Sequence, residues 1–355
     1  MKKVLIFLIF ILIVVGGVVA GVYYAVPKYK YICYIENKDY STVRDISNKW
    51  IKLTIPQGAT TMEIANILAS KNLIEDKDYF ICYTVKNKIL LKSGIFYVPG
   101  KISTNELLKI LQEPQDPYVH ITIPEGYRLD QTAKKLELYF VGIPYSNFKK
   151  DDFLQIVSNK NQIQDNYGSF EFIKSIKPST LEGFLFPETY DFEKDVVTEN
   201  IIRAMLNQFG SKAWPILNKS TEVLQLSPYQ ALIIASIVER ETNNNFEERQ
   251  MVADIIIRRL KNNWLLQTDA VLLYYYKDWS KTLTIQDLKQ NTPYNVYLHK
   301  GLPPTPICSP GETSIKAVLE HKPNNYWYYM HDKNGKIHYS TTFTEHVNNV
   351  NKYLR

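Results

Sequence analysis

Residues 227 to 242 read SPYQALIIASIVERET, a run that predicts one buried helix ending in two acids. Ser227 is a favourable N-cap residue, and Pro228 fits the first position of a helix. Residues 231–238 read ALIIASIV, with a single hydroxyl, so we expect the helix to be apolar on every side. The asparagines that follow the run should end the helix.

Glu239 and Glu241 close this helix, and helix geometry places them on different faces. Side chains two residues apart project about 200° from one another, so the two acids cannot act together on one substrate atom. Glu241 continues the face of Ile237 and Val238, where loss of solvation raises the pKa of a carboxyl and keeps it protonated as a proton donor. Surface acids are the alternative, but acids at a helix C-terminus oppose the helix dipole. Position alone favours Glu241 only slightly.

The beginning of the chain predicts a membrane anchor. After Lys2 and Lys3, residues 4–26 carry no charged side chain, and a helix of that length spans about 34 Å, enough to cross a bilayer. The apolar part of a secretory signal is shorter, about 7–15 residues. We predict a cytoplasmic stub and retained single-pass anchor over residues 1–27, with a cleaved signal as the alternative. The bulk of the chain would then lie on the extracytoplasmic side of the cell membrane, periplasmic or facing the cell wall.

The charge and cysteine content of the chain limit which binding partners and metal sites we expect. The 355 residues contain 42 Lys and Arg against 36 Asp and Glu, a formal net charge of +6. This charge suits anionic lipid or a cell-wall polymer, but without an arginine-rich stripe it gives no indication of nucleic-acid binding. The cysteines, Cys33, Cys82 and Cys308, are scattered, and without CxxC or His pairing they predict isolated thiols. We expect neither a metal nor a cofactor.

Three segments share a strand, a Pro and Gly turn, and a helix. They are LTIPQGATTMEIANIL at 53–68, YVPGKISTNELLKIL at 97–111 and ITIPEGYRLDQTAKKL at 121–136. Three unevenly spaced copies are too few for a solenoid. The pattern predicts a compact α+β module over residues 45–125, followed by a second domain over residues 126–355.

The second domain reads as mainly helical, with two irregular stretches. LEGFLFPETYDF at 181–192 contains aromatics and a proline that interrupt a helix, together with three acids, Glu182, Glu188 and Asp191. This stretch is either a loop that joins two helices or one wall of a cleft. The long segment at 291–311 is rich in proline and tyrosine, and an irregular loop of that length is usually functional or disordered.

Five segments together resemble the endolytic murein transglycosylases of the MltG (YceG-like) family. They are LEGFLFPETY, ASIVERET, LLQTDAVLLYY, TPYNVYLHKGLPPTPICSPG and HYSTTFTEH, and their order and spacing are similar to that family along the whole chain. The resemblance implies an N-terminal transmembrane helix, a LysM-like α+β module and a mainly helical, lysozyme-like catalytic domain.

The resemblance also implies a reaction. Members of this family cleave the β-1,4 bond between N-acetylmuramic acid and N-acetylglucosamine in peptidoglycan glycan strands and leave a 1,6-anhydro end. An ordinary glycosidase needs two carboxylates, whereas here the C6 hydroxyl of the muramic acid is the nucleophile and one Glu can serve as both acid and base. The family is thought to end the elongation of nascent strands beside peptidoglycan synthases.

Site residues follow from the same resemblance. The acid-Thr pair at Glu241 and Thr242 matches the family, so Glu241 takes the catalytic role, and Glu239 becomes a support that bonds a neighbouring loop. Further sugar-facing or supporting groups are Gln267, Thr268, Asp269, Tyr294 and Asn295, with Glu188 and Tyr190 as weaker candidates. Asn295 could instead be a loop-capping amide, and Tyr294 a packed ring.

Two other readings remain open at this point. The chain could be a non-catalytic peptidoglycan-binding scaffold of the cell-wall synthesis machinery, in which Glu241 has no chemical role. It could also be a hydrolytic muramidase, although the sequence shows no clear second catalytic carboxylate.

Overall fold

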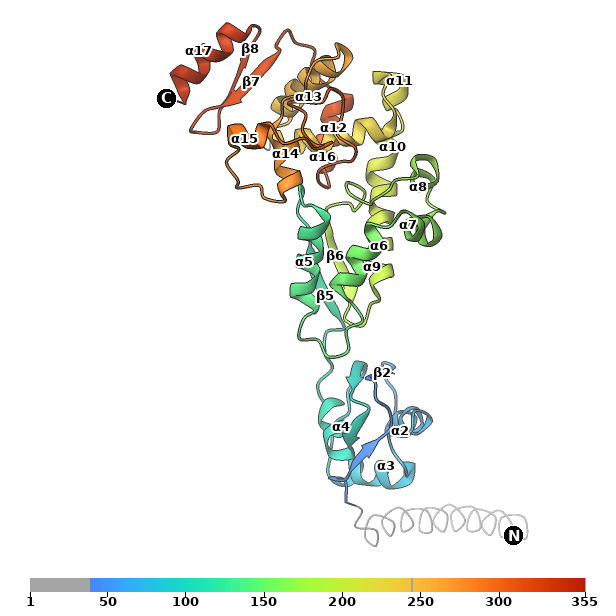
Figure 1. The fold of residues 1–355 in the computed structure, drawn as a ribbon. Coiled ribbons are helices and arrows are strands. Elements are labelled where there is room, and N and C mark those ends of the chain that lie inside the picture. Colours follow the sequence, from blue (N-terminus) through green and yellow to red (C-terminus); the bar gives the residue numbers. More distant parts are fainter. Residues whose placement is uncertain (1–38, 244, 355) are drawn as a thin grey trace, which may run out of the picture. The chain divides into compact units, whose positions relative to one another are not determined.

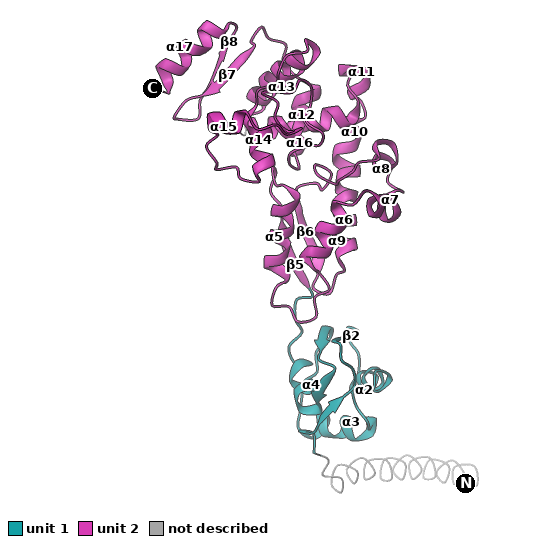
Figure 2. Cartoon of the chain, viewed as in Figure 1, with its two compact units in different colours: residues 1–117 teal, residues 118–355 magenta. Residues whose placement is uncertain are grey.

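The computed structural model describes residues 39–243 and 245–354, which divide into two compact units (Figures 1 and 2). Unit 1 ends at Pro117, and unit 2 begins at Tyr118. The predicted anchor at residues 1–27 lies outside the described residues. Over the ranges that are described, we find no helix with the length and apolar character needed to span a bilayer.

Within residues 39–117, unit 1 combines two antiparallel strand pairs with three helices; β2 pairs with β3, and β1 pairs with β4. In chain order its elements are β1 (Val43–Asp45), β2 (Ile51–Ile55), α2 (Thr61–Ser70), α3 (Lys77–Lys86), β3 (Gly94–Val98), β4 (Lys101–Ser103) and α4 (Thr104–Ile110). Two of the predicted strand-turn-helix segments lie here, and both have the predicted form.

Capping boxes and an apolar core explain why these segments fold. Thr60 and Glu63 cap α2 reciprocally, as Ser103 and Glu106 cap α4, so backbone groups at both helix starts are satisfied. The inward faces of strands and helices bury a core of aliphatic and aromatic side chains, among them Leu53, Leu68, Phe80, Phe96 and Leu107.

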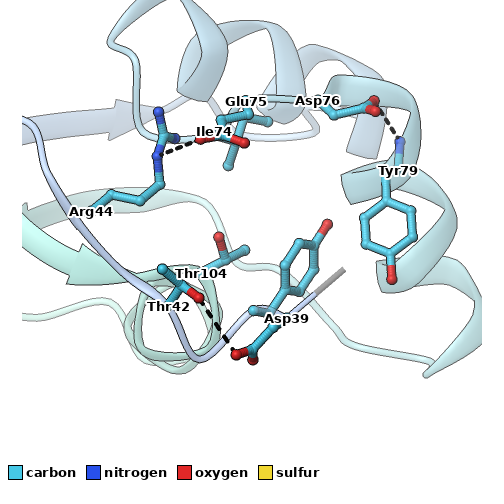
Figure 3. Close-up of a pocket in the computed structure, with 9 residues that line it drawn as sticks. Asp39, Thr42, Arg44, Ile74, Glu75, Asp76, Tyr79 and Thr104 are labelled. Atoms are coloured by element: carbon cyan, nitrogen blue, oxygen red, sulfur yellow. Dashed lines mark hydrogen bonds and ion pairs between the residues drawn. The ribbon is translucent and has the colours of Figure 1, made fainter. Parts of the chain in front are cut away.

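Unit 1 contains a pocket of about 300 Å³ near the start of its described chain (Figure 3). Arg44 Nε lies 3.4 Å from Glu75 Oε1 at this pocket, and Asp76 caps α3 by accepting a hydrogen bond of 2.9 Å from the Tyr79 N–H. These two contacts join polar groups of the pocket wall to one another and belong to the framework of unit 1.

Unit 2 is mainly helical and contains two antiparallel strand pairs, β5 with β6 and β7 with β8. Its first half comprises β5 (Tyr118–Thr122), α5 (Leu129–Phe140), α6 (Lys150–Val157), α7 (Lys160–Tyr167), α8 (Glu171–Ile176), β6 (Thr189–Glu193), α9 (Thr198–Gln208), the π-helical turn Phe209–Ala213, α10 (Trp214–Leu217) and α11 (Ser220–Leu224). Its second half comprises α12 (Pro228–Glu241), α13 (Phe246–Lys261), α14 (Asp269–Tyr276), α15 (Ile285–Leu288), α16 (Glu312–Leu319), β7 (Tyr328–His331), β8 (Ile337–Ser340) and α17 (Phe343–Tyr353). The predicted mixture of helices and strands is confirmed.

The boundary between the units differs from the sequence estimate at residues 125 and 126. Strand β5 belongs to the second unit, because it pairs along its whole length with β6, from Tyr118 opposite Glu193 to Thr122 opposite Thr189. The third strand-turn-helix segment is thus part of unit 2. Sequence patterns could not show this pairing, since its partner strand lies about 70 residues further along the chain.

The stretch at 181–192 is a core segment that leads into a strand. Residues 181–187 are buried, and Phe184 packs against Phe172 and Phe209 with ring centroids 6.0 and 5.2 Å apart. The chain then enters β6 (Thr189–Glu193). Its apolar residues therefore serve the core of unit 2, and Glu182 is buried among them.

Helix α12 is a buried helix of unit 2, as predicted. Ser227 accepts a hydrogen bond from the N–H of Gln230 in a capping box, and every residue from Ala231 to Val238 is buried. Helices α13, α14 and α16 pack around it (Figure 1). The helix ends at Glu241, so both acids lie in its last turn.

The cysteines behave differently from one another. Cys308 is a buried free thiol whose Sγ donates a 3.3 Å hydrogen bond to the Ser236 carbonyl oxygen, as expected of an isolated thiol. Cys82 on α3 is disulfide-bonded, so the expectation of an isolated thiol is wrong at that position. Sequence spacing alone could not show this, because it does not reveal which cysteines lie close together.

Candidate active site

Glu241 lies where three elements of unit 2 meet. Its Oε1 accepts a 3.2 Å hydrogen bond from the Ala270 N–H in the first turn of α14. Its Oε2 accepts a 2.9 Å hydrogen bond from the Tyr329 hydroxyl on β7. The carboxyl group is thus held from two sides at the end of a rigid helix, and its rotamer is fixed by donors that lie 29 and 88 residues away.

The surroundings keep Glu241 available as an acid. The pKa of Glu241 is raised to about 6, mainly by burial and to a smaller extent by the nearby carboxylate of Asp269. Hydrogen bonds from Tyr329 and Ala270, and the charge of Arg259, act in the opposite direction. A carboxyl with a pKa near 6 is partly protonated at neutral pH, which suits a group that must both give and accept a proton.

Glu241 opens into a groove of about 460 Å³. Polar lining comes from Arg259 on α13, from Gln267 and Asp269 at the start of α14, and from Tyr297. The remaining lining is largely aromatic and apolar and comes from β7, α17 and its end: Tyr328, Tyr329, Met330, His331, Phe343, His346, Val350 and Leu354. A groove lined by both polar groups and aromatic rings is suited to an extended, hydroxyl-rich ligand.

Gln267, Thr268 and Asp269 lie at the beginning of α14, beside Glu241. Gln267 and Asp269 line the groove, and Asp269 Oδ1 accepts a 2.5 Å hydrogen bond from the Tyr297 hydroxyl. Thr268 is buried at the N-cap position of α14, but its side chain makes no capping hydrogen bond. Gln267 has a left-handed backbone (φ 51°), which turns the chain into the helix.

Tyr294 and Asn295 lie in the loop at 291–311 and organise it. Asn295 is fully buried; its amide donates to the carbonyl oxygens of Leu288 and Gln290, and its Oδ1 accepts from the Tyr297 N–H. This is the arrangement of a loop-capping amide, and it places Tyr297 at the groove. The Tyr294 hydroxyl bonds the Thr305 hydroxyl at 2.9 Å.

Glu188 and Tyr190 lie in or next to β6 and share no contact with Glu241. Glu188 forms an ion pair with Lys212. Tyr190 is buried, stacks on Phe192, and donates a 2.6 Å hydrogen bond to the Phe186 carbonyl oxygen. The structure therefore does not bring these two candidates together with the others.

Glu239 faces away from the groove, into a closed network. Its Oε1 lies 3.0 Å from Arg249 Nη2, with only 6% and 2% of the two side chains exposed, and its Oε2 accepts a 2.9 Å hydrogen bond from the Gly311 N–H. A side chain at Gly311 would meet the carboxyl group of Glu125, which would have to move. Glu239 thus joins α12 and α13 to the end of the 291–311 loop.

The same face of α12 receives the rest of that loop. Ser236 Oγ accepts a 3.0 Å hydrogen bond from the Ile307 N–H, and the small side chains of Ala235 and Ser236 are fully buried. Small residues on this face therefore permit the close packing of the loop.

Sequence reasoning missed several residues of the site. Tyr329 donates a hydrogen bond to Glu241 and Tyr297 donates one to Asp269, both across long sequence separations. Their aromatic residue type was the signal that could have indicated a place in a sugar-binding site. Arg259 is buried and donates to the Trp327 carbonyl oxygen at 2.9 Å while lining the groove. A helical arginine next to an apolar face is a weak signal, because most such residues are surface residues.

Glu182 is a second unusual acid near α14. Its Oε2 accepts hydrogen bonds from the Leu129 N–H at 3.3 Å and the Tyr274 hydroxyl at 3.1 Å. Burial raises the pKa of Glu182 to about 8. Glu182 therefore connects Leu129 at the start of α5 with Tyr274 on α14. Tyr274 lies one helical turn after Ala270, whose N–H holds Glu241.

Among residues 39–243 and 245–354, no group of three or more His, Cys, Asp or Glu side chains is placed to hold a metal ion. The carboxyl groups of the site are instead satisfied by hydroxyl, amide and guanidinium donors.

Comparisons with known proteins agree with this architecture. A crystal structure of a YceG-like protein from Listeria monocytogenes is 30% identical, with a TM-score of 0.58, and the match covers 85% of this chain and 99% of that one. Proteins named endolytic murein transglycosylase are also similar. The one from Bacillus subtilis (strain 168) is 29% identical over 315 residues, covering 87% of this chain and 86% of its own length.

The relative from Streptococcus pneumoniae serotype 2 (strain D39 / NCTC 7466) has the same name and is 29% identical over 332 residues. The match covers 87% of this chain, but the chain spans only 59% of that relative's length. The model of the YceG-like family matches residues 53–352. This match covers most of the sequence and both compact units, and the chain therefore belongs to the YceG-like family.

Proposed function

We propose that this protein is an endolytic lytic transglycosylase of peptidoglycan, with Glu241 as its single catalytic acid and base. The observation that carries the proposal is the placement of Glu241. It opens into the groove, it is held by Tyr329 and Ala270, and its pKa is raised to about 6. The name shared by the B. subtilis and pneumococcal relatives supports the same activity.

In the proposed reaction, Glu241 donates its proton to the glycosidic oxygen as the bond from C1 of N-acetylmuramic acid to that oxygen breaks. The N-acetylglucosamine leaves with a free hydroxyl. The C6 hydroxyl of the same muramic acid attacks C1, and the Glu241 carboxylate takes the hydroxyl proton. The product has a 1,6-anhydro ring, no water is consumed, and Glu241 returns to its protonated form.

The surrounding groups suit this cycle. Two hydrogen bonds stabilise the carboxylate that forms after the first proton transfer, while burial stabilises the protonated form. Because these effects oppose one another, the pKa lies between those of a free carboxyl and a fully desolvated one. Tyr329 and Ala270 therefore position Glu241 for both halves of the reaction.

The direct test is digestion of purified, uncrosslinked glycan strands in water labelled with ¹⁸O. We expect mass spectrometry to find 1,6-anhydro ends without label. A scaffold that only binds glycan would give no new ends at all.

A hydrolytic muramidase is the second candidate, favoured by Asp269, a further carboxylate on the same groove. Its Oδ1 is bonded by Tyr297, which suits a stabilising carboxylate. This enzyme would give reducing ends that carry ¹⁸O, so the experiment separates the two reactions.

We further propose that residues 1–27 anchor the chain in the membrane lipid as a single span, with the units on the extracytoplasmic side. The disulfide at Cys82 supports that side, because disulfides persist mainly in oxidising compartments. We also propose that unit 1 is a LysM-like module, supported by its compact β2-α2-α3-β3 order. Peptidoglycan synthases are proposed partners, in keeping with termination of nascent strands.

Membrane attachment is tested by fractionating cells that produce the full chain and a variant lacking residues 1–27. We expect the full chain in the membrane fraction and the shortened chain outside it. Recovery of both chains in the same soluble fraction would contradict the anchor.

A further inference from the structure

Helix α17 presents one stripe of side chains to the groove that holds Glu241. Phe343, His346, Val350 and Leu354, which follow one another at intervals of three and four residues, all line it. This spacing keeps side chains on one helical face. The part of the stripe formed by Phe343 is largely uncovered, with 64% of that residue exposed.

The stripe continues into a platform of rings. The Tyr328 ring on β7 lies 5.4 Å from the His346 ring at an interplanar angle of 23°, and 5.9 Å from the Phe343 ring. Arg259 lies over the same Tyr328 ring, with its guanidinium carbon 5.5 Å from the ring centroid. Burial and the charge of Arg259 lower the pKa of His346, so its ring is neutral at neutral pH and can act as an apolar surface.

The platform is fixed by contacts that leave its groove side free. Thr342 and Glu345 form a capping box at the start of α17, and Asn349 donates a 2.9 Å hydrogen bond to Ser340 on β8. The capping box and the bond to β8 hold α17 in place in addition to the contact of the Phe343 ring with Tyr328. The exposed ring is available to a ligand that lies along the groove.

We propose that the α17 stripe is a glycan-binding subsite that holds the apolar face of a sugar ring of the same strand that is cut at Glu241. The proposal rests on the function proposed above and adds a binding residue, Phe343, away from the reacting bond. A pyranose ring presents a face of C–H groups and an edge of hydroxyls. The groove offers rings on α17 and β7 for the face, and Arg259, Gln267 and Asp269 for the hydroxyls.

The position of the α17 stripe in the same groove as Glu241 indicates which ligand it binds. The stripe and Glu241 line one groove, so a chain of sugars bound at Glu241 can extend over α17. An isolated apolar patch could cover many partners, but this one shares its cavity with several hydrogen-bonding side chains. A groove lined by both apolar and hydroxyl-binding side chains matches a polysaccharide better than it matches a lipid tail.

The test measures binding of purified, uncrosslinked glycan strands to the full chain in detergent, in the inactive Glu241→Gln background. Adding Phe343→Ala should weaken binding about three- to tenfold, the range expected for loss of one stacked ring. Phe343→Trp should restore it, because it keeps an aromatic face. Val347→Ala is the matched control: Val347 is 38% exposed on α17 and is not part of the groove lining among the described residues.

In the active chain, Phe343→Ala should raise KM for glycan strands while leaving kcat within about twofold, because the substitution removes binding away from the reacting bond. The thermal midpoint should stay unchanged, since Phe343 is exposed. Equal affinity of the Phe343→Ala and Val347→Ala proteins for glycan would overturn the inference. It would also be overturned if Phe343→Trp bound as weakly as Phe343→Ala.

These outcomes are separate from failure of the proposed function. Anhydro ends formed by Glu241→Gln would contradict the catalytic assignment whatever Phe343 does. Conversely, an inactive Glu241→Gln protein with unchanged glycan binding after Phe343→Ala would contradict only the α17 subsite.

Discussion

Glu239 and Glu241 are two residues apart on one helix, yet their surroundings are opposite. Glu239 is enclosed, with one oxygen paired to the buried Arg249 and the other bonded to the Gly311 N–H. Glu241 receives two neutral donors, Tyr329 and Ala270, and opens into a groove. The chemistry of a carboxyl group is decided by its partners and its access, and both differ between these two neighbours.

The difference lies in the charge of the partners. A buried carboxylate paired with a buried guanidinium makes a contact between opposite charges, and removing either member destabilises the fold. A carboxyl held by a hydroxyl and an amide can exist in both protonation states, because neither partner carries a charge. The same Glu→Gln substitution should therefore affect activity at one position and stability at the other.

Glu241→Gln should give the largest effect on activity. The amide cannot donate the proton to the glycosidic oxygen, so we expect formation of anhydro ends to fall by about 10²- to 10⁴-fold. The measurement is the initial rate of anhydro-end formation from purified glycan strands, by chromatography and mass spectrometry.

The control for Glu241→Gln is its free energy of unfolding, which we expect not to fall at pH 7. The folded pKa of Glu241, about 6, is raised above the ordinary value of 4.5. The stability that Glu241 contributes is therefore complete at low pH and lost as the pH rises through about 6. Glu241→Gln cannot ionise, so at pH 7 it should be as stable as the parent or more stable, by up to about 2 kcal/mol. A clearly lower thermal midpoint would mean that lost folding explains the lost activity.

Glu239→Gln should give the largest effect on stability. It removes the ion pair between Glu239 and the buried Arg249, and removing one member of a buried pair costs about 3–5 kcal/mol. We expect a lower midpoint in denaturant unfolding, with kcat at low temperature reduced far less than in Glu241→Gln. If Glu239→Gln were stable and inactive, while Glu241→Gln kept its activity, the assignment of the two acids would have to be reversed.

Tyr329→Phe should shift the pH dependence of the reaction. A proton donor with a pKa near 6 gives a kcat/KM that falls about tenfold for each pH unit above that value. The hydrogen bond from Tyr329 lowers the pKa of Glu241. Its removal should raise that pKa and move the alkaline limb to higher pH. An unmoved limb would show that Glu241 does not set it, and Tyr328→Phe is a control on the same strand whose hydroxyl makes no contact with Glu241 among the described residues.

The sequence predicted local features of this site far better than distant ones. The start of α12, its buried middle and the separation of its two acids follow from Ser227, Pro228 and a spacing of two residues, all encoded within one helix. The donors to Glu241 could not be found this way, because Tyr329 is 88 residues away and meets Glu241 only in the folded chain.

The same limit explains the other differences. Asn295 looked equally suited to sugar binding or to loop capping, and only its buried bonds to Leu288 and Gln290 reveal the second arrangement. Glu182 lies in LEGFLFPETY, a segment that the sequence comparison with the family identifies. Its hydrogen bond from the Tyr274 hydroxyl, however, joins two positions 92 residues apart. Residue type and local spacing predict what a side chain can do, whereas its partners come from tertiary packing.

Asp269→Asn should produce the smallest effect and the opposite shift. The charge of Asp269 raises the pKa of Glu241, so its removal should lower that pKa and move the alkaline limb to lower pH. The asparagine can still accept the hydrogen bond from Tyr297, and the fold of the groove should be retained. The measurement is again kcat/KM against pH, compared with the parent and with Tyr329→Phe. A moderate shift with kcat retained at low pH fits an Asp269 that only tunes Glu241. Loss of turnover at every pH would instead make Asp269 a second catalytic carboxylate and favour the hydrolytic reaction.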